Sequence, residues 1–562
     1  MGNISSVLNI ARDAILANTT ALNVTGSNIA NANTAGYSML VPEFGSIGVF
    51  NDEGSQEQAG VQITSIERMN NKYLDAQEIQ QEPNGAYSQA QLNVLNDVQS
   101  IFNESSTGGI NSLLSQFWSA WSQVSSNPTD LTERDNLVSV SQSLASTFNQ
   151  SANQLIQIQS DTNNQISDTV TQLNGYLAQM ADLNNQITSA QAAGNNASSL
   201  EDQRYTLLQN ISQIVQVNYN EDANGAMDLY ISNGKPLVDG STVYNLGVQA
   251  NPNNSNYYDV VFQNAPTVAI NADLQGGTLA GLLDVRDTDV GGYLNNLNNL
   301  AAAIVSSVNT QSSSGYDLNG NVGGNFFAPA GVGSPVAAGG NGYTGTVTAG
   351  GAYTGNTSTT YEVQIMSGGT LGTATYEVSS DDGQTWGSAQ QMPTSGNITL
   401  GDGITLNFAA GTFSAGDVFT VNASSAAADM QVDPGIVADV TKIAASATVN
   451  QDGDNAGSIA DIQNQNNSSL GGITIDNYYD SLETKIGQDV SNAQNSNDQQ
   501  TAILSQIDNQ RQAVSGVSLD EQLMNLIQYE TAYNAAGRLT EVANTMFGTI
   551  INLGIDTAIT TT

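Results

Sequence analysis

The chain of 562 residues contains neither cysteine nor histidine. The absence of cysteine excludes disulfide bonds and leaves the redox compartment undetermined. The absence of both residues excludes Ser-His and Cys-His nucleophile systems and zinc sites of the usual ligand sets. Carboxylates alone can still support catalysis, as in glycosidases, but among 52 acidic residues a suitable pair arises by chance. We therefore expect no catalytic residue, no metal and no cofactor.

Basic residues are also scarce. Only 11 residues are Lys or Arg, so the formal net charge is −41, and none lies between Arg286 and Lys442. A nucleic-acid-binding protein neutralises phosphates with clustered Lys and Arg, and an anionic membrane attracts the same residues. No such cluster occurs in the sequence. We therefore expect neither nucleic acid nor a membrane as a partner.

Long apolar runs are missing as well. None approaches the roughly 20 residues that span a bilayer. The first residues, MGNISSVLNIARDAILANTT, lack the basic region and the following apolar run of a signal peptide. The sequence thus predicts neither a transmembrane helix nor a cleaved signal peptide.

The N-terminal segment has a heptad repeat. Apolar residues recur every seven positions in one row, which consists of Leu8, Ile15, Leu22 and Ile29. A weaker row, four positions earlier in each repeat, consists of Ile4, Ala11, Asn18 and Thr25. This pattern predicts a helix of about 28 residues with one narrow apolar stripe. Such a helix is poor at folding alone and needs a partner helix.

The C-terminal segment carries a matching repeat. Two rows recur every seven residues and lie three positions apart: Tyr529, Ala536, Ala543 and Ile550, and Ala532, Leu539, Met546 and Leu553. The simplest interpretation is that the two chain ends pair with each other and then with other subunits. We predict a coiled-coil subunit interface made of Leu8, Ile15, Leu22, Ile29, Tyr529, Leu539, Met546, Ile550 and Leu553.

Further helices are predicted inside these ends. Apolar residues recur at steps of three or four from Leu137 to Ile187, with one skipped turn, and a turn at 194–196 leads to a shorter returning helix at 200–214. Similar spacing from Tyr479 to Val514 predicts another long helix, and 113–121 predicts a packed helical core.

The middle of the chain has a different pattern. Residues 216–285 alternate between apolar and polar and predict strands, and 294–308 predicts a short helix. Residues 331–425 are rich in Gly and Thr without a helical period, and TYEV at 360–363 recurs at 375–378, which indicates sister strands.

These patterns predict a mainly α protein with a β-rich middle, built as a long rod rather than a globule with a cleft. The expected parts are terminal coiled-coil helices at 1–40 and 516–562, a helical rod domain from 41–215 and 430–515, a mixed β/α domain at 216–330 and an inserted β-rich outer domain at 331–429.

Three acidic motifs have a structural explanation. Residues 379–386, SSDDGQTW, resemble the Asp-box hairpin of sialidases and other β proteins, in which the Asp binds turn amides. Residues 452–454 and 317–321 only partly match a calcium loop and lack its full twelve-residue pattern. We expect all three to be structural turns.

The two repeats lie in recognisable sequences. LNVTGSNIANANTAGYS at 22–38 resembles the N-terminal signature of the axial flagellar proteins, the family of rod, hook and hook-associated proteins, and 516–553 resembles the matching C-terminal signature. The residues of the family signature turn are Asn28, Asn31, Asn33, Gly36 and Tyr37. Within the family, Gly-Tyr-Ser at 36–38 and GVSLDE at 516–521 favour the hook-associated members. Met39 departs from the pattern, because the family usually has Arg there.

This resemblance implies a structural subunit of the bacterial flagellum that joins hook to filament and is exported by the flagellar type III route. The implied partners are further copies in a ring, the hook protein, the second hook-associated junction protein and an export chaperone that holds the C-terminal helix. The alternatives are another axial protein, namely the hook subunit or second junction protein, a carboxylate-dependent glycosidase, and an additional adhesive role of the β insert.

The terminal stripe predicts the effect of one substitution. Each buried apolar side chain contributes on the order of 1.5–3 kcal/mol, so Leu22→Asp should block incorporation into flagella without unfolding the middle domains. Met546→Leu nearly keeps the side-chain volume and should be tolerated. Swimming and the protein content of isolated flagella measure both effects, and normal motility of the Leu22→Asp strain would refute the prediction.

Overall fold

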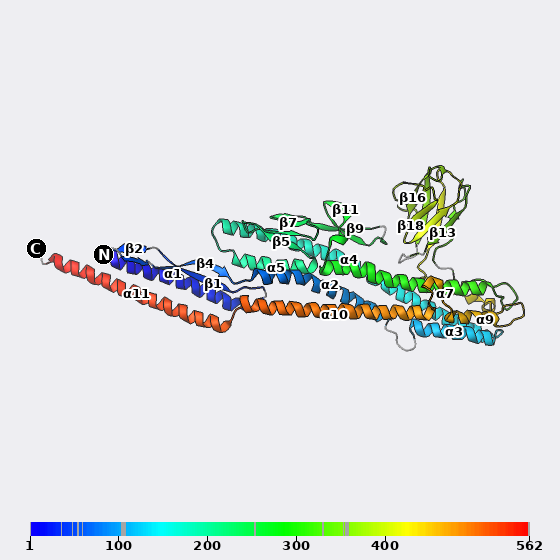
Figure 1. Cartoon of the computed structure of the whole chain (residues 1–562), viewed down its shortest axis with the longest axis horizontal. Helices are drawn as coiled ribbons and strands as arrows, with labels where there is room; N and C mark the ends of the chain where they lie inside the picture. The colour runs from blue at the N-terminus through cyan, green and yellow to red at the C-terminus, as the bar shows by residue number, and fades with distance from the viewer. Residues whose placement is uncertain are drawn as a thin grey trace.

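The protein is an elongated rod of long helices, with both chain ends at one end of the rod and two β-rich units on one side (Figure 1). The computed structural model describes residues 2–34, 36–47, 49–52, 55–58, 60–102, 108–251, 254–328, 331–351, 353 and 359–559. Within these ranges, side chains are described except at 2–4, 49–52, 55–58 and 553–559.

The axis of the rod consists of helices from both halves of the chain. These helices are α2 (Lys72–Phe102), α3 (Ile110–Ser126), α4 (Leu131–Ala192), α5 (Ser198–Ile214), α7 (Gly291–Ser313) and α10 (Ile475–Ser515). The longest, α4, has 62 residues, and the Asp130 side chain caps its first turn by accepting a bond of 2.8 Å from the Thr132 amide. Its predicted apolar positions face the core, as Leu144, Phe148 and Leu155 are fully buried.

Helices α2 and α10 run antiparallel although they are almost 400 residues apart in sequence. Ser88 of α2 lies 2.9 Å from Ser496 of α10, and Asp75 pairs with Arg511 at 3.2 Å. A small residue of α2, Gly85, faces Leu504 of α10, and an added Cβ would lie 3.2 Å from the leucine Cδ1. The two helices therefore hold the N- and C-terminal halves together along the rod.

An aromatic cluster closes the end of the rod away from the termini. Phe117 and Trp121 of α3 pack against Phe326 and Phe327, with ring centroids 4.9–6.3 Å apart. Ser125 donates a 2.8 Å hydrogen bond to the Gly453 carbonyl, next to α9 (Asp454–Ala460). The helical core predicted before Pro128 is confirmed. The short α8 (Pro434–Ala438), η3 (Val440–Lys442), η4 (Asp461–Asn464) and η5 (Ser468–Leu470) connect this end to α10.

The first β-rich unit lies against α4. A four-stranded sheet contains β5 (Asn218–Glu221), β6 (Met227–Tyr230), β7 (Pro236–Asp239) and β8 (Thr242–Val243), and a three-stranded sheet contains β9 (Leu246–Ala250), β10 (Tyr258–Phe262) and β11 (Ala265–Ala269). The strands end at Ala269 rather than continuing to 285. Residues 271–290 instead form η1 (Asn271–Asp273), α6 (Gly277–Asp284) and the π-helical turn η2 (Val285–Val290), because Leu279, Leu282 and Leu283 bury one helical face.

The second β-rich unit projects from the rod and has its own hydrophobic core (Figure 1). Its strands are β12 (Val336–Ala337), β13 (Val347–Gly351), β14 (Thr359–Ser367), β15 (Gly369–Thr370), β16 (Thr375–Ser379), β17 (Gln390–Gln391), β18 (Asn397–Gly401), β19 (Ile404–Phe408), β20 (Thr412–Phe413) and β21 (Val418–Ala423). The two TYEV segments are sister strands as predicted, since β14 pairs with β16 and Val363 lies opposite Val378.

A segment expected within the helical rod domain is β-structured instead. Residues 40–68 contain β1 (Leu40–Ser46), β2 (Val49–Asp52), β3 (Ser55–Gln58) and β4 (Val61–Arg68), and β1 pairs antiparallel with β4. The alternation of apolar and polar residues in VQITSIER, with Val61, Ile63 and Ile66, is the physical reason for a strand here. The helices of the rod begin only at Lys72.

The predicted fold class, mainly α with a β-rich middle and paired terminal helices, is confirmed. Across the described part of the chain, no helix combines the length and the apolar character that a membrane span requires.

The middle of the rod contains a group of neighbouring carboxylates, one of which, Asp289, has a raised pKa. Tyr87 donates to Asp284 at 2.5 Å, and Tyr293 donates to Asp489 at 2.7 Å. Burial and, to a smaller extent, the charges of Asp284 and Asp489 raise the pKa of Asp289 to about 6, with Lys485 opposing the shift. The folded protein therefore favours the protonated form of Asp289.

This shift predicts a pH-dependent loss of stability. A raised pKa in the folded state gives stability that is complete below the unfolded pKa of about 4 and is lost as pH rises through about 6. We expect Asp289→Asn to raise the free energy of unfolding by about 1–2 kcal/mol over the wild type at pH 7.5 and to change it little at pH 4. This range allows for the partial solvent exposure of the site. Urea unfolding of both proteins at the two pH values measures the difference, and an equal gain at both would contradict it.

Candidate assembly site at the paired chain ends

Helices α1 (Gly2–Asn31) and α11 (Leu519–Ile559) lie side by side and antiparallel, beyond the end of the rod axis (Figure 1). Small side chains are buried on both helices: Ala11, Ala17 and Ala21 on α1, and Ala536 and Ala543 on α11. Such residues let two helix backbones approach closely, so the contact is narrow and tight.

The four residues of the predicted α1 stripe, Leu8, Ile15, Leu22 and Ile29, are each half-buried. The weaker heptad row is buried more completely, since Ala11, Asn18 and Thr25 are at most 7% exposed. Asn18 and Thr25 satisfy their polar groups within the helix by donating to the Ala14 and Ala21 carbonyls at 2.7 and 2.9 Å. The large side chains therefore flank the intramolecular contact and remain partly available to other molecules.

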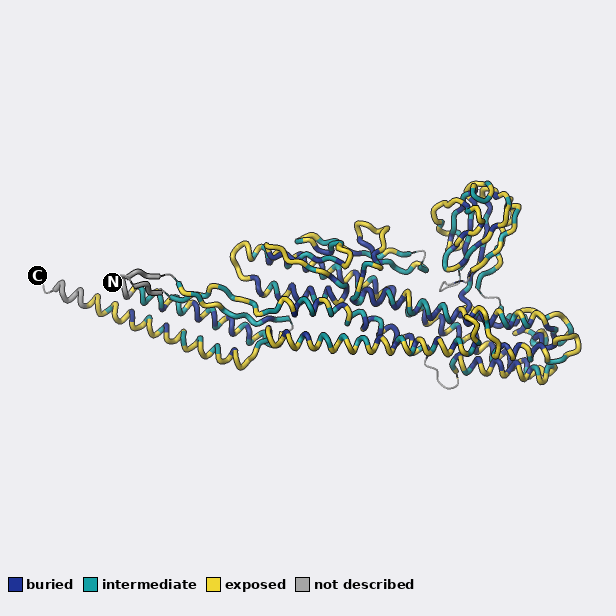
Figure 2. Tube along the Cα trace, in the orientation of Figure 1, coloured by how far each residue is buried: buried dark blue, intermediate teal, exposed yellow. Residues whose placement is uncertain are grey.

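The predicted α11 residues lie mostly outside the contact with α1. Tyr529 is half-buried, with its ring centroid 5.8 Å from that of Phe44 on β1. Leu539, Met546 and Ile550 are 39%, 52% and 44% exposed, and Figure 2 shows α11 as largely exposed along its length. The side chain of Leu553 lies outside the described residues.

The exposed apolar residues of α11 form a continuous stripe. Leu539, Val542, Met546 and Ile550 follow one another at steps of three and four, which places them on one helical face. Their exposed fractions range from 39% to 55%. Isolated exposed apolar residues are normal, but a contiguous row of this kind marks a surface for another molecule. We call these four residues the α11 stripe.

Asn28 is the centre of the signature turn. It is 1% exposed and pairs with the backbone of Leu40 like a neighbouring strand, accepting from the Leu40 amide at 2.9 Å and donating to the Leu40 carbonyl at 2.8 Å. It also donates to Gln522 of α11 at 3.0 Å and accepts from the Tyr37 hydroxyl at 2.8 Å. One buried amide thus joins α1, the turn, β1 and α11.

The rest of the turn is fixed by backbone geometry. Gly36 has φ +77°, and an added Cβ would lie 2.3 Å from the Thr206 hydroxyl of α5, so a glycine is required for two reasons. Asn31 donates to the Ser27 carbonyl at 3.0 Å, whereas Asn33 is exposed. The turn therefore docks onto the rod at α5.

Met39, which replaces the arginine usual in the family, lies where the terminal helices leave the rod. Its amide donates to the Ser515 carbonyl at 2.9 Å, and its sulfur lies 3.4 Å from the Gln522 side-chain nitrogen. Ser515 is the last residue of α10 and Gln522 lies in the first turns of α11. The residue thus bridges the bend between the two C-terminal helices.

A cluster of buried ion pairs holds the same region, and it was not predicted from the sequence. Arg511 of α10 reaches Asp75 at 3.2 Å and Glu78 at 3.4 Å, both on α2, and its guanidinium carbon lies 4.5 Å from the ring centre of Tyr205 on α5. The Tyr205 hydroxyl donates to Glu78 at 2.7 Å. All four side chains are less than 10% exposed. The only indication in the sequence was the position of Arg511, a basic residue within an apolar helical pattern in a chain with few basic residues.

A second ion pair extends this cluster towards β4. Arg68 donates to Asp202 of α5, and both side chains are 11% exposed. Burial raises the pKa of Asp202, while the Arg68 charge and its hydrogen bond oppose the shift. Because a lone buried charge is costly, removal of either partner would destabilise the cluster far more than the pair itself stabilises it.

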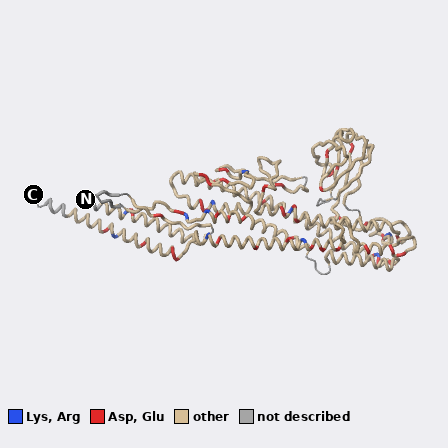
Figure 3. Tube along the Cα trace, viewed as in Figure 1, with Lys and Arg blue, Asp and Glu red and all other residues tan. Residues whose placement is uncertain are grey.

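In the part of the chain that the structure describes, basic side chains are scattered along the molecule and form no patch (Figure 3). Several are used internally: Arg134, for example, is 1% exposed and donates to the Pro128 and Ile443 carbonyls at 2.8 Å each.

The three acidic motifs form turns in the structure. Asp381 accepts from the amide and the hydroxyl of Thr385 at 2.8 and 2.6 Å, and these bonds lower the pKa of Asp381 to about 2. Asp317 accepts from the amides of Asn319 and Asn321, and Asp452 accepts from the Ala447 amide, at 2.8 Å in each case. In the described residues, no three or more potential acidic ligands gather around one point.

Comparison with known proteins matches this arrangement at both chain ends and in the rod. Residues 8–37 match the flagella basal body rod protein family, 509–553 match the flagellar basal body rod FlgEFG protein C-terminal family, and 95–327 match the flagellar hook-associated protein FlgK helical domain.

Individual relatives extend over the whole chain. Flagellar hook-associated protein 1 of Escherichia coli (strain K12) is 27% identical over 570 residues, covering 98% of this chain and 100% of the relative. Its Bacillus subtilis (strain 168) counterpart is 26% identical over 576 residues, covering 97% of each. The solved flagellar hook junction protein FlgK of Burkholderia pseudomallei has the same fold, with a TM-score of 0.58 and 22% identity, over 78% of this chain and 100% of that one.

The paired terminal helices, the helical rod and the matched families define a structural axial component of the bacterial flagellum. The resemblance seen in the two terminal signatures is therefore confirmed. Within the axial proteins, the chain is similar over nearly its whole length to flagellar hook-associated protein 1.

The role of Asn28 leads to a test in the isolated protein. Asn28→Ala leaves the partly buried Leu40 amide and carbonyl without their Asn28 partners, which should cost about 1–3 kcal/mol of local stability. Hydrogen exchange of the Leu40 amide should accelerate accordingly. The matched control is Asn33→Ala, which removes an exposed side chain of the same turn and should leave that exchange rate unchanged. Equal exchange rates in the two variants would contradict the role of Asn28.

Proposed function

We propose that this protein joins the flagellar hook to the filament by adding, through its terminal helices, to the distal end of the hook. The observation that carries the proposal is the α11 stripe, which remains exposed although α1 and α11 already cover each other through small side chains. Burying four such side chains against neighbours contributes on the order of 1.5–3 kcal/mol each when complete. Repeated around a ring of subunits, this gain makes assembly cooperative.

We infer that the half-buried row on α1 takes part in the same assembly. Leu8, Ile15 and Leu22 flank the narrow contact with α11, so a neighbouring helix can complete their burial. The expected partners are further copies of the chain, the hook protein on one side and the second hook-associated junction protein on the other. The relationship to rod and hook families at both chain ends supports partners that use the same helical packing.

We propose that the chain is exported unfolded through the flagellar type III channel, and the relationship of both chain ends to flagellar rod and hook families supports this route. The exposed stripe also requires protection before assembly, because an apolar surface of this kind promotes aggregation. A chaperone that covers the C-terminal helix until export provides that protection. The final location is the extracellular hook–filament junction.

The proposed role requires no catalysis. Support comes from the acidic motifs, in which Asp317, Asp381 and Asp452 are bound by amides of their own turns. A carboxylate held in this way by neutral donors stabilises a turn and is not poised for proton transfer.

A matched pair of substitutions tests the proposal. Met546→Asp places a charge in the α11 stripe, whereas Thr545→Asp places the same charge on the adjacent polar face, where Thr545 is exposed. In a strain that lacks the wild-type gene, Met546→Asp should abolish swimming and release unassembled protein into the medium. Thr545→Asp should swim normally.

Circular dichroism of both purified variants checks that the rod still folds. Swimming of the Met546→Asp strain at the level of the wild type would exclude the α11 stripe as an assembly surface.

A further inference from the structure

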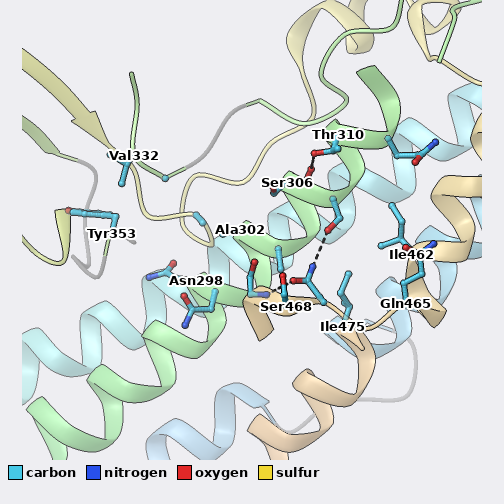
Figure 4. A pocket seen from close by; sticks show the side chains of 18 of the residues that line it. Asn298, Ala302, Ser306, Thr310, Val332, Tyr353, Ile462, Gln465, Ser468 and Ile475 are labelled. Atoms are coloured by element: carbon cyan, nitrogen blue, oxygen red, sulfur yellow. Dashed lines mark hydrogen bonds between the residues drawn. The ribbon is translucent and has the colours of Figure 1, made fainter. Parts of the chain in front are cut away.

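A cleft of about 690 Å³ lies where the projecting β unit meets the rod. Its walls come from one face of α7, from residues 462–475 and from the base of the β unit, and Figure 4 shows Ala302, Ser306 and Thr310 following one another along α7 on the cleft side. The volume falls in the range of small-molecule sites, roughly 300–1,000 Å³, which occur preferentially between domains.

The chemistry of the walls is polar and uncharged. No Asp, Glu, Lys or Arg is among the described residues that line the cleft, although the whole chain has a net charge of −41. Side-chain amides and hydroxyls dominate instead, for example Asn299, Ser306, Gln465 and Ser468. Each of these groups both donates and accepts hydrogen bonds. A charged ligand would find no counter-charge here, whereas a neutral ligand rich in hydroxyls would find many partners.

Apolar surface is interspersed with these polar groups. Ala302, Val332, Ile462 and Ile475 line the cleft, together with Tyr353 from the β unit. A saccharide ring has polar hydroxyls around its edge and apolar C–H faces, so it requires a lining of both kinds. Aromatic and aliphatic surface receives the faces, and amides and hydroxyls receive the edge.

Asn298 supplies an independent indication of a ligand. It is 3% exposed, and its oxygen accepts from the Ser425 hydroxyl at 2.9 Å and from the Ala427 amide at 3.0 Å. Asn298 lines the cleft, and its buried side-chain nitrogen has no hydrogen-bond partner. Unsatisfied buried donors are rare inside proteins and require an explanation. A small side-chain adjustment at Asn298 that admits an acceptor oxygen from the cleft would supply the missing bond.

The loop between η4 and α10, which lines one side of the cleft, is held in place by hydrogen bonds. Asn467 donates to Ser307 of α7 at 3.1 Å and accepts from the Ser469 amide at 2.9 Å, which fixes the loop between η4 and α10 against α7. A fixed loop lowers the conformational cost of binding. From size, neutrality, mixed lining and the unpaired Asn298 donor, we propose that this cleft binds a short neutral saccharide.

The test uses the purified full-length protein and defined probes. Maltotriose, cellotriose and triacetylchitotriose are titrated with detection by saturation-transfer NMR, and at least one should bind. Trigalacturonate and the peptide Asn-Gly-Ser serve as charged and peptidic comparisons and should bind more weakly. Ser306→Trp should lower the affinity at least about tenfold by filling the cleft, whereas Ser313→Trp, another exposed serine of α7 that does not line it, should leave the affinity unchanged.

Each outcome decides the proposal. Both variants carry the same change at exposed positions of one helix, so equal melting temperatures establish that folding is intact. Lack of binding by all three neutral probes overturns the proposal. It is also overturned if Ser306→Trp and Ser313→Trp bind equally, or if the charged probe or the peptide binds more tightly than every neutral saccharide.

Discussion

The close contact between α1 and α11 is the constraint on which the rest of the structure depends. Alanines on both helices allow the approach, and the buried amide of Asn28 fixes the register by binding Leu40 and Gln522 together. Because the first and last helices are thereby joined, α2 and α10 continue side by side into the rod. The chain leaves this pair of helices at the end of α2 and returns to it at the start of α10, so the intervening domains are inserted between the two.

Much of this arrangement could be predicted from periodicity. The heptad rows located α1 and α11, the spacing from Leu137 to Ile187 located α4, and the repeated TYEV located two paired strands. Each of these patterns can be read from a short stretch of sequence, because one face of each helix or strand must be buried and its apolar residues therefore recur with a fixed period. The strands at 40–68 and the helical turns at 271–290 were not predicted, since short elements contain too few repeats to distinguish the two periods.

The candidate site was only partly predictable for a different reason. A heptad row shows that a face is apolar but does not show which neighbour covers it. The row around Leu8 proved to be half-buried, while the row of Ala11, Asn18 and Thr25 is buried. Likewise, the cluster of Arg511 with Glu78 and Tyr205 connects residues hundreds of positions apart. Contacts of that kind depend on the tertiary structure and produce no periodic pattern in the sequence.

The projecting β unit is attached to the rod through two adjacent crossings of the chain. Gly331 and Ser424 exchange hydrogen bonds with each other, and the Gly333 amide donates to the Asn422 carbonyl at 2.7 Å. Its hydrophobic core is separate from that of the rod. Since entry and exit occupy neighbouring positions, a unit of another size can be exchanged at this point while the axial helices keep their spacing. The outer surface of the flagellum at this position can therefore evolve independently of its axial helices.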